Sequence, residues 1–507
     1  MKKSYWVLFL FIIAKFILQY VLVSPEYDLQ RDEYLHLDQG NHLAWGYLSV
    51  PPVSSWFAWL IKILGGSLFW VRFFPTLFGA LTIVVVWKII EELKGSMFTQ
   101  ILAGLGILLS VLLRLNMLFQ PNSLEVLIWT LFFYILIKYV NTEKVQWLYW
   151  GGLVFGIGVL NKYNIAFLAL GFIPALLTTD QRKIFRNPHV YGAGILTLIL
   201  ILPNLLWQYH NNFPVIHHMK ALSENQLVNV NRFDFLRAQA LFFIGVTFVI
   251  IAGFYALLFE QSFKKMRFFF WGYVITIALF MFFRAKDYYA IGLYPVYIAF
   301  GAVYLGMILE KGWKKLLKPI CILHPILLFV PVYYLAFPNK SPEAIVKNPE
   351  WYKKFGLLRW EDGKDHSLPQ DFADMQGWRE LAQKTDHEYT KLSKTGNTLV
   401  LCDNYGQAGA INYYSKAGIK AVSFNADYIN WFDFSKKYDN LIRVKDYSEG
   451  MEELKDTSPY FVHSKILDSI TNPYAREEGA RIFSFKNAKI NINNRLKKEI
   501  EEVKKEY

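Results

Sequence analysis

Long apolar runs separated by short polar segments dominate the first 337 residues of the chain. A helix needs roughly 20 apolar residues to cross the hydrocarbon core of a bilayer. Runs near this length occur at 4–23, 68–90, 97–113, 122–140, 147–161, 164–178, 190–208, 236–259, 267–283, 288–309 and 319–337. Lys162 interrupts the pattern between 147 and 178, so the span count there stays open. The pattern predicts a polytopic α-helical membrane protein with about 11 spans.

The sequence becomes more polar after about residue 338, and its apolar runs become short. Residues 398–402 are typical of a buried strand, 403–409 of a loop, 410–416 of a helix and 421–424 of a second strand. Another helix is predicted over 371–384, and the charged end from Arg495 is either helix or a frayed tail. We expect a transmembrane domain over 1–337, followed by a small α/β domain over 338–507.

The charge distribution predicts the orientation of the chain. The formal net charge is +13, and only 19% of the residues are charged, against about 25% in soluble domains. Basic residues gather in alternate short loops, as in Lys264 and Lys265, which matches the positive-inside rule for the plasma (inner) membrane. The N-terminus is then cytoplasmic, and eleven spans place the α/β domain outside. The basic excess therefore reflects topology rather than a nucleic-acid partner.

The first outer loop, over 24–67, carries an acidic pair, Asp32 and Glu33. Gly46-Tyr47 and Pro51-Pro52 follow in the same loop. Ionisable groups at membrane depth are expensive and tend to face an internal cavity, so they are candidates for function. The same outer side presents further candidates, namely Arg72, Asn122, Glu125, Lys162, Tyr163, Arg284, Lys286, Tyr288 and Tyr289.

These motifs, in this order, resemble the GT-C membrane glycosyltransferases. The resemblance rests on the Asp32-Glu33 loop, Val71-Arg72, Gln120-Pro121 before Glu125, Asn161-Lys162-Tyr163, Leu206-Trp207-Gln208, Lys286-Asp287-Tyr288-Tyr289 and Tyr405 to Ala410. The nearest branch is that of the bacterial dolichyl-phosphate-mannose protein mannosyltransferases, which includes the lipid A aminoarabinose transferases. The resemblance implies transfer of a sugar from a polyprenyl phosphate to an acceptor on the outer face of the membrane.

The two acids of the first loop are the predicted catalytic residues. Displacing a phosphate from an anomeric carbon requires an activated nucleophile, cations at the leaving group and a site that excludes water. Asp32 is predicted to act as general base, or to orient an acceptor that is already ionised; the alternative is that it caps a short helix. Adjacent helical residues point about 100° apart, so Glu33 need not enter the same site.

The outer cations and tyrosines are predicted to bind the donor phosphate. This set comprises Arg72, Lys162, Tyr163, Arg284, Lys286, Tyr288 and Tyr289. Snorkelling at a span end is the alternative for Lys162 and Arg72, and an interfacial aromatic belt is the alternative for the two last tyrosines. Glu125 and Asn122 are predicted to orient the acceptor or to supply a second acid. Many relatives carry an aspartate in the equivalent outer loop, whereas this chain has Asn122 and then Glu125. This departure counts against a metal-binding or acceptor-orienting role for the second acid.

The sequence thus favours an inverting glycosyltransferase that uses a polyprenyl-phosphate sugar and a lipid, glycan or protein acceptor. No cofactor is required by the pattern, and a divalent cation is left open. A transporter or lipid-linked sugar flippase is the alternative, although no inverted repeat or pair of broken helices supports it. A membrane scaffold would leave the outer acids and cations unexplained. The glycines at 406 and 409 are explained by a strand–loop–helix turn rather than by nucleotide binding.

Overall fold

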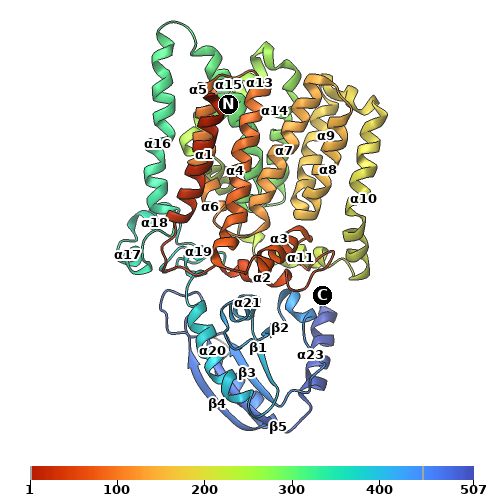
Figure 1. Cartoon of the computed structure of the whole chain (residues 1–507), viewed down its shortest axis with the longest axis vertical. Coiled ribbons are helices and arrows are strands. Elements are labelled where there is room, and N and C mark those ends of the chain that lie inside the picture. The colour runs from red at the N-terminus through yellow and green to blue at the C-terminus, as the bar shows by residue number, and fades with distance from the viewer. Residues whose placement is uncertain (1–2, 448–449, 507) are drawn as a thin grey trace.

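The computed structural model describes residues 3–447 and 450–506 as a helical bundle with a sheet at one end (Figure 1). The long helices run side by side, and the N-terminal end of the described chain lies at the end of the bundle away from the sheet (Figure 1). The bundle contains α1 (Lys3–Val21), α4 (Leu68–Glu92), α5 (Met97–Leu108), α6 (Val111–Leu115), α7 (Pro121–Thr142), α8 (Gln146–Asn161), α9 (Ala166–Leu177), α10 (Pro188–His210), α13 (Thr247–Phe259), α14 (Phe268–Phe282), α15 (Tyr294–Ile308) and α16 (Lys318–Leu335).

Each of the eleven predicted apolar runs contains a helix. Six described helices are long and apolar enough to cross a membrane, namely Ser4–Val21, Leu68–Glu92, Pro121–Thr142, Pro188–His210, Asp287–Ile308 and Gly312–Leu335. Two helix pairs bent by 109° and 67° raise this number to eight if each pair is one span, and three apolar helices are shorter. The chain is therefore a multi-pass membrane protein, while the count of eleven stays a prediction.

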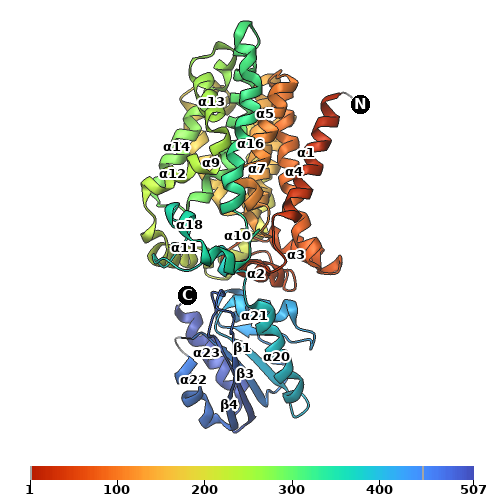
Figure 2. The same ribbon diagram turned by 90° about the vertical axis from the view of Figure 1, so that its left-hand side faces the viewer.

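Several of the short helices lie at the end of the bundle that faces the sheet. Figures 1 and 2 show α2, α3 and α11 at this end of the bundle. The short helices are α2 (Arg31–Gln39), α3 (Val53–Ile63), α11 (Pro214–Asn225), α12 (Arg232–Phe242), α17 (Pro342–Lys347), α18 (Glu350–Lys354) and α19 (Gln370–Ala373). The 3₁₀ turns are η1 (Tyr163–Ile165), η2 (Asp180–Arg186), η3 (Leu227–Asn229), η4 (Ile244–Val246), η5 (Gln261–Met266), η6 (Asp287–Leu293), η7 (Gly312–Leu317), η8 (Ala426–Asn430) and η9 (Ser458–Tyr460).

The C-terminal part is built on a five-stranded mixed sheet in the order β2-β1-β3-β5-β4. Its strands are β1 (Thr398–Cys402), β2 (Val422–Ser423), β3 (Asn440–Lys445), β4 (Phe461–Ser469) and β5 (Arg481–Ala488). β1 is parallel to β2 and β3, whereas β5 is antiparallel to β3 and β4. Its helices are α20 (Trp378–Leu392), α21 (Tyr405–Tyr414), α22 (Gly450–Thr457) and α23 (Ile492–Glu506).

Two local predictions for the C-terminal part need correction, and a third, which left two alternatives open, is decided by the structure. The predicted loop over 403–409 is wrong, because α21 begins at Tyr405: the side chain of Asn404 caps its first turn by accepting from the amide of Gln407. The helix predicted over 371–384 is divided into α19 and α20, with Gly377 between them at φ +84°. The charged C-terminal end is helical, in α23, rather than frayed.

One apolar core joins the bundle to the sheet. It contains Tyr34 of α2 and Phe74 of α4 together with Trp378 of α20, Val400 of β1 and Ile411 of α21, all of them buried. Burial of apolar surface is the main favourable contribution to folding. The C-terminal part is therefore packed against the first outer loop and is not a separate appendage on a linker.

Candidate functional site

The site begins at α2, whose first turn is fixed by its own side chains. Gln30 is the N-cap: its side-chain oxygen accepts from the amide of Asp32, 2.9 Å away, and its own amide donates to Glu33 Oε2 at 2.8 Å. This reciprocal arrangement is a capping box, with Gln in place of the usual Ser or Thr. It sets the direction of the two acids that follow the cap.

Glu33 points into the bundle. Its side chain has no exposed surface, and Oε1 lies 3.2 Å from Nη1 of Arg72 on α4 and accepts from the amide of Phe119 at 2.8 Å. Arg72 also donates to the carbonyl oxygen of Met117. Removing one member of such a buried pair leaves an uncompensated charge. The geometry thus ties α2 to α4 and to the turn before α7, and the predicted catalytic role of Glu33 stays a prediction.

Asp32 points toward the C-terminal part and is only partly buried. The hydroxyl of Tyr405, at the start of α21, donates to Oδ1 at 2.7 Å. The side chain of Gln120, before α7, donates to Oδ2 at 3.4 Å. One carboxylate oxygen is therefore held by a strong hydrogen bond, while the other has a single long one and is the better placed to accept a proton.

A chain of hydrogen bonds connects Asp32 to Lys162. The side chain of Gln120 donates to Asp32, and its Oε1 accepts from the side-chain amide of Asn122 at 2.9 Å. Lys162 Nζ, from the turn after α8, donates to Asn122 Oδ1 at 2.8 Å and to Glu125 Oε2 at 3.0 Å. An acid from the first loop and a cation from a distant turn are thus connected through one set of hydrogen bonds, while their roles as base and phosphate ligand stay predictions.

Aromatic rings and a second amide surround Lys162. Its Nζ lies 4.4 Å from the ring centroid of Tyr289 and 5.4 Å from that of Tyr288, within the range of cation–π attraction. Asn164 donates to Glu125 Oε1 at 2.8 Å and to the backbone carbonyl of Tyr289 at 3.1 Å. The Lys162 side chain is 18% exposed and that of Glu125 is 6% exposed, so the pair lies in a largely dry setting that strengthens its attraction.

Lys286 belongs to the same side of the site but has a different partner. Its Nζ lies 2.6 Å from Glu361 Oε1, in the segment that leads to α19. Burial opposes ionisation of both groups, yet their attraction prevails: the pKa of Lys286 is raised above its usual value and the pKa of Glu361 is lowered. A carboxylate therefore occupies the contact that the sequence assigns to a donor phosphate.

Three other predicted ligands lie apart from this hydrogen-bond chain. Arg72 is committed to Glu33. The hydroxyl of Tyr163 donates to Asn204 of α10 at 2.9 Å, and so links η1 to that helix. Arg284 donates to the carbonyl of Val228 at 3.0 Å. Their predicted contacts with the donor phosphate remain predictions.

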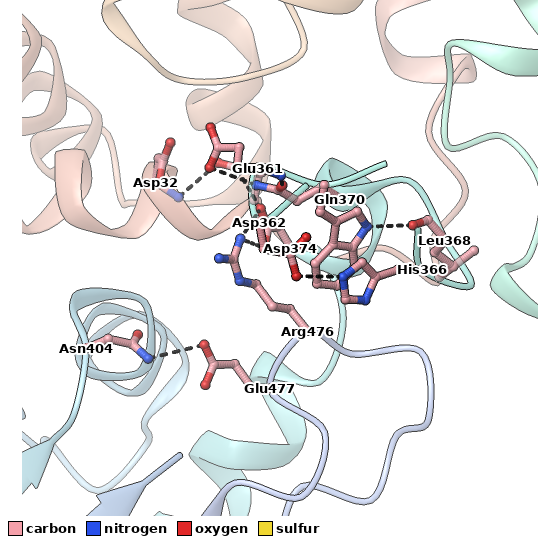
Figure 3. A network of polar contacts seen from close by, with 12 residues as sticks. Asp32, Glu361, Asp362, His366, Leu368, Gln370, Asp374, Asn404, Arg476 and Glu477 are labelled. Atoms are coloured by element: carbon pink, nitrogen blue, oxygen red, sulfur yellow. Dashed lines mark hydrogen bonds and ion pairs between the residues drawn. The ribbon is translucent and has the colours of Figure 1, made fainter. Parts of the chain in front are cut away.

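The C-terminal part supplies charged groups that are absent from the site predicted from the sequence. Asp374, Arg476 and Glu477 lie with Asp32 where α2 meets this part (Figure 3). Burial raises the pKa of Asp374 to about 7, and Arg476, 3.1 Å away, opposes that rise. Arg31 stacks over the Tyr405 ring at 4.5 Å, and its buried Nε has no hydrogen-bond partner among the described residues. In the sequence, the only sign that Arg31 belongs to the site is its position next to Asp32.

A metal centre is not formed by the side chains at hand. In the described ranges 3–447 and 450–506, no group of three or more His, Cys, Asp or Glu side chains is arranged to hold an ion. The acids at the site have Lys, Arg, Tyr or amide partners instead. This donor set does not fit a resident divalent cation.

Part of the chain matches the model of a known protein family. Residues 49–207 match the family model described as "Dolichyl-phosphate-mannose-protein mannosyltransferase". This stretch includes Asn122, Glu125 and Lys162 and leaves out Asp32 and the C-terminal part. No curated protein matches the chain in a sequence search.

The fold is similar to that of ArnT from Cupriavidus metallidurans. The crystal structure of ArnT bound to undecaprenyl phosphate superposes with a TM-score of 0.63 at 12% identity, over 95% of this chain and 98% of that one. The structure of ArnT in the apo state superposes with a TM-score of 0.63 at 12% identity, over 96% of this chain and 98% of that one. A third structure is that of AglB, an oligosaccharyltransferase from Archaeoglobus fulgidus, in complex with an inhibitory peptide and a dolichol-phosphate. It superposes with a TM-score of 0.48 at 11% identity, over 96% of this chain and 75% of that one. The family match and the ArnT-like fold confirm the resemblance to GT-C glycosyltransferases that the sequence indicates.

Proposed function

We propose that this protein is a membrane glycosyltransferase that moves a sugar from a polyprenyl phosphate to a lipid, glycan or protein acceptor, with inversion at the anomeric carbon. The observation that carries the proposal is the hydrogen-bond chain from Asp32 through Gln120 and Asn122 to Lys162. Two further findings support it: the mannosyltransferase family match includes Lys162, and the similar ArnT structure holds undecaprenyl phosphate.

In the proposed reaction, Asp32 takes a proton from the acceptor hydroxyl while the hydroxyl oxygen attacks the anomeric carbon. The bond between that carbon and the phosphate oxygen breaks, and the bonding electrons leave with the polyprenyl phosphate. Lys162 stabilises the charge on the leaving phosphate as a point charge. If the acceptor is already an ionised phosphate, Asp32 orients it and takes no proton.

The proposed topology places the N-terminus in the cytoplasm and the site, together with the C-terminal part, outside the plasma (inner) membrane. The basic loops support this orientation. The donor lipid can then stay in the bilayer while its phosphate reaches Lys162 at the bundle end. A domain boundary near residue 337, where α16 has just ended, is part of the same proposal.

The test is transfer by purified Asp32→Asn protein in liposomes that contain a polyprenyl-phosphate sugar. The change keeps the shape and the ability to accept from Tyr405 but removes the base, so turnover should fall roughly 100-fold or more. Asp371→Asn is the matched control, because it removes an acid at the same bundle end that pairs with Arg114 rather than with the site. Near wild-type turnover by Asp32→Asn would defeat the mechanism. Donor movement across the bilayer without transfer would favour a flippase.

A further inference from the structure

The helix α21 is packed against α2 along most of its length. A Cβ atom added to Gly406 would lie 2.6 Å from Arg31 Cγ, and one added to Gly409 would lie 2.6 Å from Tyr34 Cβ. Both distances are too short for a side chain, so these glycines permit the close approach of the two helices. Asn412, one turn further on, donates to Asp38 Oδ2 at 2.7 Å. The glycine pattern at 406 and 409 therefore has a packing role between two distant segments.

The first turn of α21 is also fixed from the side of the sheet. Asn404, its N-cap, donates to Glu477 Oε1 at 3.2 Å, and Gln407 donates to Glu477 Oε2 at 2.8 Å. The guanidinium of Arg31 covers the face of the Tyr405 ring. Tyr405 is thus confined between α2 and the sheet, and its hydroxyl has one defined direction, toward Asp32 Oδ1.

We infer that Tyr405 is a positioning residue for Asp32, so that the C-terminal part completes the transfer site; this rests on the function proposed above. The hydroxyl donates to a carboxylate, and charge-assisted hydrogen bonds of this kind are short and directional. It holds Oδ1 and leaves Oδ2 turned to the acceptor. Tyr405 itself does not touch the reacting atoms. Its removal should therefore slow the chemical step and spare donor binding.

The experiment compares Tyr405→Phe with Tyr413→Phe in the full-length protein in liposomes. Tyr413 lies on the same helix and donates to the carbonyl of Gly66 at 3.1 Å, so its variant loses a similar inter-segment hydrogen bond without touching Asp32. Tyr405→Phe should lower kcat about tenfold and leave the donor KM within about twofold of wild type. Tyr413→Phe should change neither value. A wild-type kcat for Tyr405→Phe would overturn the inference.

A second pair of variants distinguishes positioning from a general loss of structure. Asp32→Glu keeps a carboxylate but lengthens the side chain by one methylene, which changes the geometry of the hydrogen bond from Tyr405. If Tyr405 acts through Asp32, adding Tyr405→Phe to this variant should lower kcat by less than about twofold further. An equal tenfold loss in both backgrounds would mean that Tyr405 acts independently of Asp32 and would refute the inference alone. Full turnover by Asp32→Asn would instead refute the proposed function, and the inference with it.

Discussion

Two neighbouring acids of α2 have opposite surroundings. Glu33 is buried against Arg72 and a backbone amide, whereas Asp32 faces Tyr405 and Gln120 with one oxygen lightly bound. Residues next to each other on a helix point about 100° apart. This difference is enough to direct Glu33 into the bundle and Asp32 toward the C-terminal part. Lys162 and Glu125 form an ion pair, so each charged group has its partner within the protein.

The Lys162 contact predicts a loss of donor affinity that can be separated from a loss of fold. Lys162→Met alone would leave the buried Glu125 unpaired, which is strongly destabilising. We therefore expect the double variant Lys162→Met/Glu125→Gln to fold and to show a donor KM at least about tenfold above that of Glu125→Gln alone. Kinetics at varied donor concentration measure this. Equal KM values would remove Lys162 from the donor site.

Sequence alone gave the acid pair and Lys162 but not the partners that orient them. Long apolar runs predict each membrane helix, because a membrane helix satisfies its backbone hydrogen bonds within one segment. The contact between Asp32 and Tyr405 joins residues 373 positions apart, and no local pattern encodes it. Arg72 was assigned to donor binding because a buried arginine and a ligand-binding arginine look the same in sequence. Its ion pair with Glu33 appears only once α2 and α4 are packed together.

At the scale of elements, the loop that leads to α19 covers the predicted phosphate side of the site. The backbones of Arg359 and Asp365 form an isolated antiparallel β-bridge. The rings of Trp360 and His366 stack with their centroids 3.7 Å apart, and Gly363 adopts φ +77°, so the loop is a compact unit. It carries Glu361 to Lys286. A donor phosphate that binds Lys286 must displace this carboxylate.

Glu361→Gln should therefore lower the donor KM by a few-fold, because a neutral amide competes less well than a carboxylate for the lysine. Asp362→Asn is the matched control, since that neighbour contacts His366 instead of Lys286. Both variants are compared with wild type by transfer kinetics. A donor KM that is unchanged or higher in Glu361→Gln would mean that Lys286 does not bind the donor.

At the scale of the whole molecule, the sheet and the bundle share one core and one site. The buried cluster that runs from α2 and α4 to α20 and α21 fixes the C-terminal part against the first loop. The helices that are predicted to bind the donor and α21, which carries Tyr405, are then parts of one folded unit. Stability of the C-terminal part should consequently matter for activity as well as for folding.

A partly buried acid of the C-terminal part, Asp446, predicts a dependence of stability on pH. Burial, with repulsion from Glu477, raises the pKa of Asp446 from 3.8 to about 7. Because the pKa of this acid is higher in the folded state than in the unfolded state, the folded state binds the proton more tightly. The free energy of unfolding therefore falls as pH rises from about 4 to about 7. Asp446→Asn should then raise the melting temperature in detergent by on the order of 2–4 °C at pH 8 and have little effect at pH 4.

Asp433→Asn is the control for this effect, because hydrogen bonds from Ser435 lower the pKa of the exposed Asp433 rather than raise it. That variant should give no stabilisation at pH 8. Equal stabilisation by Asp446→Asn at pH 4 and pH 8 would show that the ionisation of Asp446 is not the cause.

The proposed orientation can be tested with cysteines introduced at exposed positions. An impermeant maleimide should label Lys436→Cys, in the C-terminal part, on intact cells, and should label Lys264→Cys, in η5, only after the membrane is permeabilised. Both lysines are exposed in the structure. The reverse labelling pattern would place the site in the cytoplasm.

The most direct measurement is a structure of the full-length protein with a polyprenyl phosphate bound. The account predicts a phosphate oxygen within hydrogen-bond distance of Lys162 Nζ, in place of its contact with Asn122 or Glu125, at the same bundle end as the Asp32 carboxylate. Asp32 should still accept from Tyr405, with its other oxygen turned to the space beside the phosphate. A phosphate held elsewhere, with the Lys162–Glu125 ion pair intact, would contradict the central claim that this acid and this cation serve one transfer site.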